Sequence, residues 1–149
     1  MTTRVAKRIS VVLVNDNPSE RKRVVSGITA ASGLQVLAAA AGTAAALRKA
    51  RETRPDLVLL KLRREGSDSL TLAAALHGGV PESRVVLMGV GPQQEELISF
   101  VRAGVSGFIM EDAPFGRVLS TLRVVAQGIQ VLPLELTHSL FDQLKGYDV

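Results

Sequence analysis

The chain has 149 residues, of which 46% are hydrophobic, 21% charged and only 3% aromatic, which is typical of one globular domain with an aliphatic core. It contains no cysteine, which excludes disulfides and thiol chemistry, and no apolar run approaches the length of a membrane span. The formal net charge is +4, from small basic groups that we interpret as solvated helix faces rather than a nucleic-acid surface. We expect a cytoplasmic protein.

Short apolar runs alternate with helical patterns along the chain. Strands are predicted at residues 9–14, 34–39, 57–62, 84–88 and 108–110. Helices are predicted between residues 17 and 33, 42 and 55, 69 and 77, 92 and 104, and 115 and 128, with a tail helix at about 133–145. The third run is continuously apolar, as in a parallel strand buried on both faces. Five strand–helix units predict an α/β fold with a parallel sheet covered by helices on both faces.

The first helix has a recognisable start. Asn17 is a suitable N-cap, Pro18 suits the first helical position, and Glu20 completes a pattern that resembles a capping box. The domain organisation predicted along the chain is a basic N-terminal tail at 1–8, an α/β domain at 9–132 and a C-terminal linker helix at 133–149. Neither nucleotide-binding glycine motif is present, and the isolated His77 and His138 have no second ligand at metal spacing.

The ends of the predicted strands indicate where a site lies, because ligands of open α/β sheets bind beyond the carboxyl ends of the strands. The residues found there are Asn15, Asp16, Lys61, Gly89 and Glu111. Lys61 is unusual, since it interrupts an apolar run in which an unpaired ammonium group would be costly. We expect it to reach a carboxylate, with Asp16 and Glu111 as candidates.

The sequence resembles the receiver domains of response regulators, and most closely those of the NarL/FixJ class. The matching segments are residues 11–18, 54–62, 85–89 and 103–113, followed by a similar ending at 128–133. The resemblance implies a CheY-like, flavodoxin-like doubly wound sheet of five parallel strands in the order 2-1-3-4-5. It also implies a pocket in which an aspartate accepts a phosphoryl group from a histidine kinase, helped by Mg²⁺, a hydroxyl group and a lysine.

This chain departs from the family pattern at most positions of that pocket. The departures are Asn15 for the first metal-binding acid, Lys61 for the phosphoacceptor aspartate, Gly89 for the hydroxyl residue, Glu111 for the family lysine and Phe108 for the switch aromatic. A lysine cannot form an acyl phosphate, and Asp16 alone remains of the acidic pair that would hold Mg²⁺. The resemblance therefore implies a receiver with a lost Mg²⁺ site, no cofactor and no catalytic residue, and not an enzyme.

The exchange of charge between two of these positions suggests an internal replacement for the family's aspartate–lysine pair. Lys61 is a cation where the family has an acid, and Glu111 is an acid where the family has a cation. We hypothesise that they form a salt bridge that fixes the pocket in one state.

Four functions are compatible with these observations. The favoured one is a phosphorylation-independent receiver that acts as a signalling and dimerisation module in two-component systems, as the N-terminal part of a transcription regulator or as a stand-alone adaptor. Its partner would be a protein or a second copy, and DNA would be bound only through a helix-turn-helix domain absent from this chain, with no membrane contact. The family's contact surfaces suggest Val101, Phe108, Val118, Leu122 and Val125 as contact residues, although these also suit a core.

The alternatives are a receiver that still responds to phosphorylation at another residue, a sensor that binds a small ligand at the strand ends, and an enzyme. The ligand hypothesis rests on the polar groups of Asn15, Asp16, Lys61 and Glu111, with Lys61 attracting an anion. An enzyme is the least favoured, because neither a nucleophile–base pair nor a cofactor loop is visible.

Overall fold

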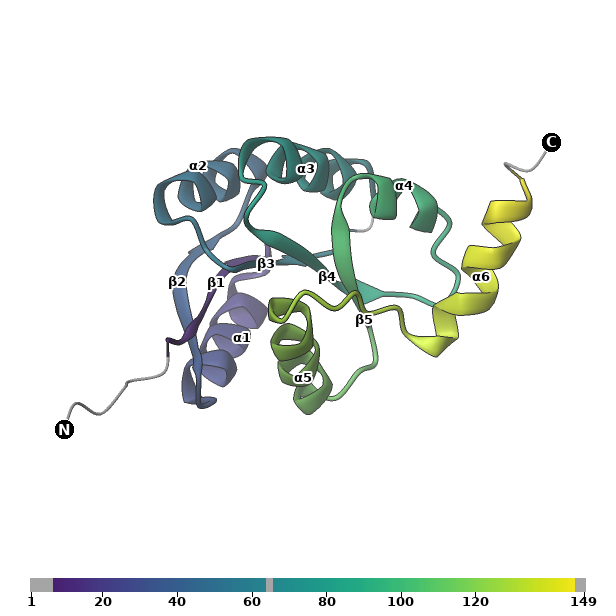
Figure 1. Ribbon diagram of the computed structural model, residues 1–149. Coiled ribbons are helices and arrows are strands. Elements are labelled where there is room, and N and C mark those ends of the chain that lie inside the picture. The colour runs from purple at the N-terminus through teal and green to yellow at the C-terminus, as the bar shows by residue number, and fades with distance from the viewer. Residues whose placement is uncertain (1–6, 64–65, 147–149) are drawn as a thin grey trace.

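A computed structural model describes residues 7–63 and 66–146 and contains a parallel sheet between two layers of helices (Figure 1). The strands are β1 (Ile9–Val14), β2 (Leu34–Ala40), β3 (Leu57–Lys61), β4 (Arg84–Val90) and β5 (Val105–Met110). The helices are α1 (Pro18–Ala30), α2 (Thr43–Thr53), α3 (Gly66–Gly79), α4 (Leu97–Arg102), α5 (Phe115–Ala126) and α6 (Leu134–Lys145). The sheet order is β2-β1-β3-β4-β5, which confirms the predicted fold and strand order.

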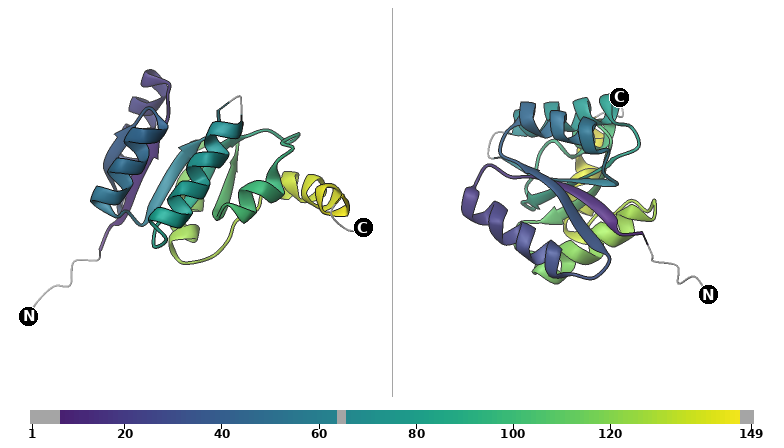
Figure 2. Two further views of the ribbon diagram at one scale, coloured as in Figure 1. Left: turned by 90° about the horizontal axis from the view of Figure 1, so that it is seen from above. Right: turned by 90° about the vertical axis from the view of Figure 1, so that its left-hand side faces the viewer.

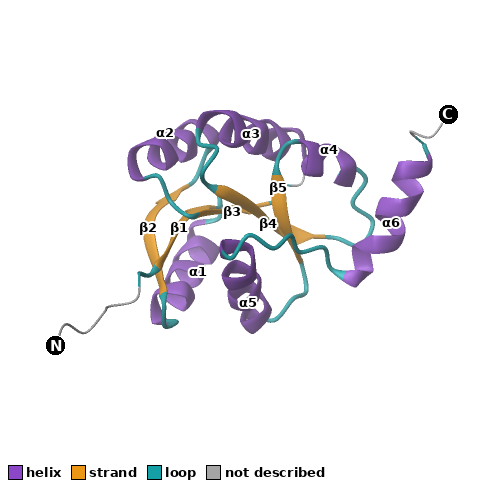
Figure 3. Cartoon of the chain, in the orientation of Figure 1, coloured by secondary structure: helices purple, strands orange, loops and turns teal. Residues whose placement is uncertain are grey.

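Each face of the sheet has its own apolar core, because alternate residues of a strand point to opposite faces. Helices α2, α3 and α4 cover one face and α1 and α5 the other (Figure 3). In β3, Val58 and Leu60 belong to the first core, whereas Leu57 and Leu59 belong to the second. The strand is buried on both faces, which accounts for its continuous apolar run.

Most of the apolar residues predicted as a contact surface lie in these cores. Phe108, Val118, Leu122 and Val125 are buried, and only Val101 is exposed, at 43% of its surface. The prediction of a contact role is therefore wrong for the four buried residues. They pack β5 and α5 against the rest of the domain.

The start of α1 is formed as predicted, with one exception. The Asn17 side chain accepts a hydrogen bond from the Glu20 backbone N–H at 3.0 Å, and Pro18 is the first helical residue. The backbone N–H of Asn17 donates to Asn15 Oδ1 at 3.0 Å. In a capping box the Glu20 side chain would accept this hydrogen bond from the Asn17 N–H. Asn15 accepts it instead, so the Glu20 carboxylate is available for another partner.

Strands β4 and β5 and helix α3 extend beyond the bounds that the sequence predicts. Strand β5 begins at Val105, because Val105 and Gly107 pair with β4, with Ser106 at a register shift between them, although this segment lacks an apolar pattern. A Cβ atom on Gly107 would lie 2.8 Å from a methyl group of Val125, so the glycine permits the close packing of α5. Strand β4 continues to Val90, and α3 begins at Gly66 instead of residue 69.

The predicted tail helix is present as α6, which lies at the edge of the molecule beside α4 (Figure 2). Leu136 of α6 is completely buried in the core that also contains α4. The segment expected to be a linker is therefore packed against the domain over the part that the structure describes. Most of the predicted tail at 1–8, and residues 147–149, lie outside the described residues. Within residues 7–63 and 66–146, no helix is long and apolar enough to cross a membrane.

Candidate functional site

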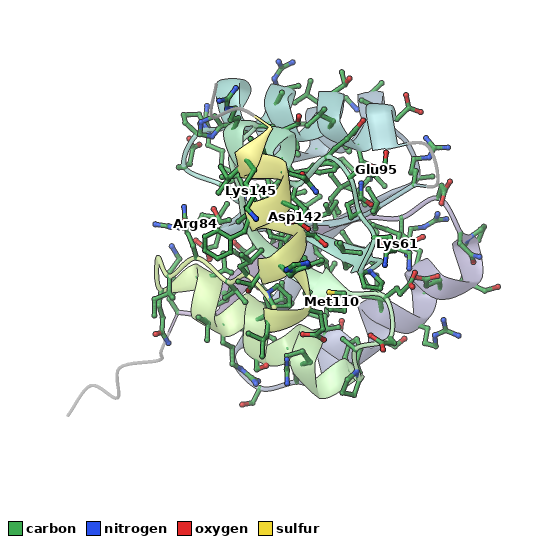
Figure 4. All side chains as sticks on the ribbon, turned by 90° about the vertical axis from the view of Figure 1, so that its right-hand side faces the viewer. Lys61, Arg84, Glu95, Met110, Asp142 and Lys145 are labelled. Carbon is green, nitrogen blue, oxygen red and sulfur yellow. The ribbon has the colours of Figure 1, made fainter. Side chains whose placement is uncertain are left out.

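The five residues predicted from the strand ends lie at the carboxyl edge of the sheet. Asn15 and Asp16 follow β1, Lys61 ends β3, Gly89 lies near the end of β4, and Glu111 follows β5. Figure 4 shows Lys61 on the opposite side of the molecule from Arg84, the first residue of β4. The topology has thus brought together residues that are far apart in the sequence.

Lys61 lines two of the hollows at this edge. An open groove of about 800 Å³ lies between Lys61, Gly89, Glu111 and the segment 91–96 that leads into α4. A second hollow of about 430 Å³ is lined by Asn15, Asp16 and Lys61, together with residues of α1 and the β3–α3 loop. Lys61 is the one predicted site residue that lines both of these hollows.

The partner of Lys61 is Glu20 of α1. Lys61 Nζ lies 3.0 Å from Glu20 Oε1, and the two side chains are 28% and 23% exposed. The predicted pairing of Lys61 with Glu111 or Asp16 is therefore wrong. Asp16 pairs with another cation, and Glu111 has no ion pair with any described residue.

The alternation of β3 explains why Lys61 reaches α1. Lys61 points to the same face as Leu57 and Leu59, which pack with Val24 and Ile28 of α1. The first turn of α1 begins just beyond the end of β1, the strand next to β3. A side chain from this turn can therefore meet Lys61 directly, whereas β5 lies two strands away from β3, at about 10 Å.

The ion pair changes the acidity of Glu20. The hydrogen bond from the Lys61 ammonium group lowers the pKa of Glu20 below its ordinary value of 4.5, against an opposing effect of partial burial. The charge of Lys61 acts in the same direction. Glu20 is therefore ionised at neutral pH and offers Lys61 a full negative charge.

Asn15 is held in place at the floor of the second hollow. It is 2% exposed, and its backbone carbonyl accepts a hydrogen bond from the Arg21 guanidinium group at 2.9 Å. Its side-chain Oδ1 accepts a hydrogen bond from the Asn17 backbone N–H. Its Nδ2 atom is buried without a hydrogen-bond partner among the described residues. The oxygen that could bind a cation is thus already used within the chain.

Arg63 forms two further ion pairs at the same edge of the sheet. Arg63, in the loop after β3, lies 3.2 Å from a carboxylate oxygen of Asp16 and 3.5 Å from one of Asp68 in α3. These side chains are 42% exposed or more, so each contact contributes little free energy. Together they nevertheless join the loops that follow β1 and β3.

Sequence reasoning overlooked Glu20 and Arg63 as site residues. The sequence pattern places Glu20 in the helix cap, and Arg63 directly follows the third apolar run. A usable signal existed for both, because the first turn after β1 and the first residues after β3 must lie at the same edge as the strand ends. The sequence does not show which of the acidic residues at that edge forms the ion pair with Lys61.

The three remaining predicted residues, Gly89, Glu111 and Phe108, lie in different surroundings. Gly89 has a φ of +81° and lies against the Lys61 side chain. Glu111 is exposed and lines the groove opposite Lys61, close to Gly91. Phe108 is 3% exposed and packs in the core below α4. No group of three or more acidic or histidine side chains suited to a metal ion occurs among residues 7–63 and 66–146.

The sheet order and the sequence define the class of the protein. Residues 11–123 match the family model of the response regulator receiver domain. Since this segment is most of the chain, the chain belongs to the response regulator receiver family. The family links it to two-component signal transduction.

Individual relatives come from the NarL and LuxR groups of regulators. The oxygen regulatory protein NreC of Staphylococcus aureus is 25% identical over 136 residues, which cover 91% of this chain and 63% of NreC. The chain thus spans less than two thirds of that relative's length. The signal receiver domain of the response regulator NarL from Mycobacterium tuberculosis superposes with a TM-score of 0.75 at 26% identity, covering 83% of this chain and 99% of that domain.

The same fold is found in a two-component response regulator of the LuxR family from Aurantimonas sp. SI85-9A1. Its TM-score is 0.81 at 20% identity, with 93% of this chain and 99% of that chain covered.

Proposed function

We propose that this chain is a receiver domain that signals by protein contact and independently of phosphorylation. The observation that carries the proposal is the ion pair of Lys61 with Glu20 at 3.0 Å, at the position where the resemblance to receiver domains places the phosphoacceptor aspartate. An ammonium group cannot replace a carboxylate as the nucleophile that forms an acyl phosphate. The Lys61–Glu20 pair instead links β3 to α1 and favours a single arrangement of the pocket.

The surroundings of Lys61 also disfavour the other steps of phosphoryl transfer. Gly89 supplies no hydroxyl group, and the exposed carboxylate of Glu111 would repel an incoming phosphoryl group. The family lysine that would attract the phosphoryl oxygens is absent from that position. These features support a structural role for this site and not a role in phosphoryl transfer.

The residues at this edge do not fit the Mg²⁺ ion that the family uses. Mg²⁺ prefers near-octahedral oxygen ligands, and the cationic side chains of Lys61 and Arg63 occupy this region. Asp16 is already paired with Arg63, and Asn15 Oδ1 accepts the Asn17 N–H. A divalent cation would have to displace these contacts against the repulsion of two positive charges.

A titration with Mg²⁺ and beryllofluoride, a mimic of the phosphoryl group, tests the proposal. Amide NMR shifts would be followed at Asp16, Lys61, Gly89 and Glu111, and treatment with acetyl phosphate followed by intact mass measurement would detect covalent phosphate. We expect no saturable shifts and no phosphorylated species. Saturable shifts that extend to Phe108 and α4, or a phosphorylated protein, would contradict the proposal.

The variant Lys61→Asp is the matched control for these measurements. It returns a carboxylate to the acceptor position while leaving Gly89 and Glu111 unchanged. Phosphate uptake by the variant alone would locate the loss of function at Lys61. Absence of uptake in both proteins, with a folded variant, would indicate that the other substitutions are sufficient to prevent it.

A second candidate function is binding of a small polar ligand at the strand ends. The open groove beside Lys61 supports it, since Lys61 and Glu111 line it and offer both charges. A thermal-shift screen of metabolites, repeated on Glu111→Ala, tests this candidate. A ligand that stabilises the original protein and not the variant would favour it over the contact function.

For the partners, we propose a protein or a second copy of this chain. Any DNA binding would belong to a helix-turn-helix domain outside this chain, by analogy with the regulators of the same class. Size-exclusion chromatography with light scattering tests self-association, and a monomer at all concentrations would exclude the second copy.

A further inference from the structure

Helix α6 covers an apolar surface next to α4. Leu136 is completely buried in the core that contains Leu97 and Phe100 of α4 and Phe108 of β5. Leu140, one turn further along α6, is half-buried and packs against the same core. The two leucines therefore form an inner face of α6, which Figures 1 and 2 place alongside α4 at the edge of the domain.

Polar groups on the same side of α6 bind the segment that leads into α4. Gln143 Oε1 accepts a hydrogen bond from the Leu97 backbone N–H at 3.0 Å, and Gln143 Nε2 donates to the carbonyl oxygen of Gln94 at 2.9 Å. The Ser139 hydroxyl group donates to the Pro92 carbonyl oxygen at 3.1 Å. The Gln143 side chain thus binds both Leu97, the first residue of α4, and Gln94 in the segment before it.

These bonds are important because α4 is weak by itself. It has six residues, which is too short for an independently stable helix, and its N-cap residue Glu96 makes no side-chain capping bond. The Gln143 side chain supplies the missing cap by accepting the first helical N–H. The docking of α6 therefore adds a cap to a short helix that is otherwise held by its buried residues.

We propose that α6 is an intramolecular strap that masks a helix-binding surface on α4 and β5 and holds α4 in its helical form. The masked surface fits an amphipathic helix with the spacing of Leu136, Leu140 and Gln143, which are four and three residues apart. The occupant in this chain is its own α6. A partner's helix can bind this surface only when α6 has been released.

The strap also touches one wall of the groove at the strand ends. Pro92, Gln93, Gln94, Glu95 and Glu96 line that groove opposite Lys61. Release of α6 frees this wall. The proposal does not depend on whether the pocket accepts phosphate.

Hydrogen exchange of the full chain, measured by NMR, tests the strap. In Gln143→Ala the Leu97 amide should exchange about fivefold faster or more, because it loses its acceptor. Gln143→Glu keeps the acceptor oxygen and loses only the donor to Gln94, so Leu97 should remain better protected than in Gln143→Ala. Unchanged Leu97 exchange in Gln143→Ala would overturn the proposal.

A pair of leucine variants separates docking from helix content. Leu136→Ala removes the buried anchor, and Leu144→Ala makes the same change at a residue of α6 that is 44% exposed. We expect faster exchange throughout α4 and α6 in Leu136→Ala only, with the amides of β1 and β3 still protected. Equal effects of the two variants would contradict docking through the inner face.

The masked surface is probed with a synthetic peptide of residues 134–145. The peptide should bind Leu136→Ala, restore the protection of Leu97 and leave the original protein unaffected. Failure to bind a variant whose α4 has lost protection would overturn the masked surface. The experiments are repeated at several concentrations, because protection of Leu97 that rises with concentration would show that α6 docks on a second copy instead.

Discussion

The Lys61 side chain lies directly on the backbone of Gly89. A methyl group built on Gly89 would be 2.9 Å from Lys61 Cε and 3.0 Å from Nζ, which is closer than ordinary van der Waals contact. Gly89 also has a φ of +81°, a conformation that other residues adopt with strain. A side chain at position 89 would therefore displace Lys61 from Glu20 as well as straining the backbone.

The variant Gly89→Ala should lower the free energy of unfolding by about 2 kcal/mol. About 1 kcal/mol arises from the left-handed backbone, and about 1 kcal/mol from disturbance of the Lys61–Glu20 pair. Urea unfolding followed by circular dichroism measures the change. In the background of Lys61→Ala, the cost of Gly89→Ala should fall to about 1 kcal/mol, because only the backbone strain remains.

Gly33→Ala is the matched control for this prediction. Gly33 has a φ of +80°, almost the same as Gly89, but no atom lies within 4 Å of the position that an added methyl group would take. It should cost about 1 kcal/mol with or without Lys61. Equal costs of Gly33→Ala and Gly89→Ala would show that the contact with Lys61 contributes nothing.

A double-mutant cycle on Lys61→Ala and Glu20→Ala should give a coupling free energy of about 1 kcal/mol. The pair is largely shielded from water and joined by a charge-assisted hydrogen bond, so it exceeds a typical exposed ion pair. Chemical unfolding of the four proteins measures it. The corresponding cycle with Glu111→Ala should be additive, and coupling to Glu111 instead of Glu20 would reverse the assignment.

Acid should weaken the fold partly through Glu20. Because the folded-state pKa of Glu20 is lowered from 4.5, its contribution is fully present above about pH 4.5 and disappears as the pH falls through the lower folded-state value. Each unit of this pKa difference corresponds to about 1.4 kcal/mol. Glu20→Gln should therefore lose less stability than the original protein between pH 7 and acid pH, as measured by urea unfolding. Parallel losses would refute a shifted Glu20.

Glycine substitutions on α1 and α5 should have opposite effects. Gly116→Ala in α5 has open space and should stabilise by up to about 1 kcal/mol through helix propensity. Gly27→Ala in α1 would place a methyl group 2.5 Å from the ring of Phe115, so the gain should be cancelled or reversed. Thermal unfolding distinguishes the two. Adding Phe115→Ala should recover the gain at Gly27, and a stabilising Gly27→Ala in the original protein would mean that the ring moves freely.

The fold was largely predictable because the signals for it are local. The apolar runs, the Asn17 cap and the continuous apolar stretch of β3 each follow from neighbouring residues, and their order restricts the topology. The bounds of β4 and β5 were less predictable, since Val105 and Gly107 join the strand through pairing with β4 across a register shift at Ser106. The predicted positions of Asn15, Asp16, Lys61, Gly89 and Glu111 at one edge follow from the parallel arrangement itself.

The sequence by itself determined the receiver family and the presence of a lysine at the end of β3 that needs a carboxylate. Only the tertiary structure decided that Glu20 is this carboxylate, because the choice depends on which face of the sheet Lys61 points to and which helix covers that face. The same holds for α6, whose helical pattern is visible in the sequence. Its docking was decided by the tertiary structure, which buries Leu136 and brings Gln143 to the Leu97 backbone N–H across the fold.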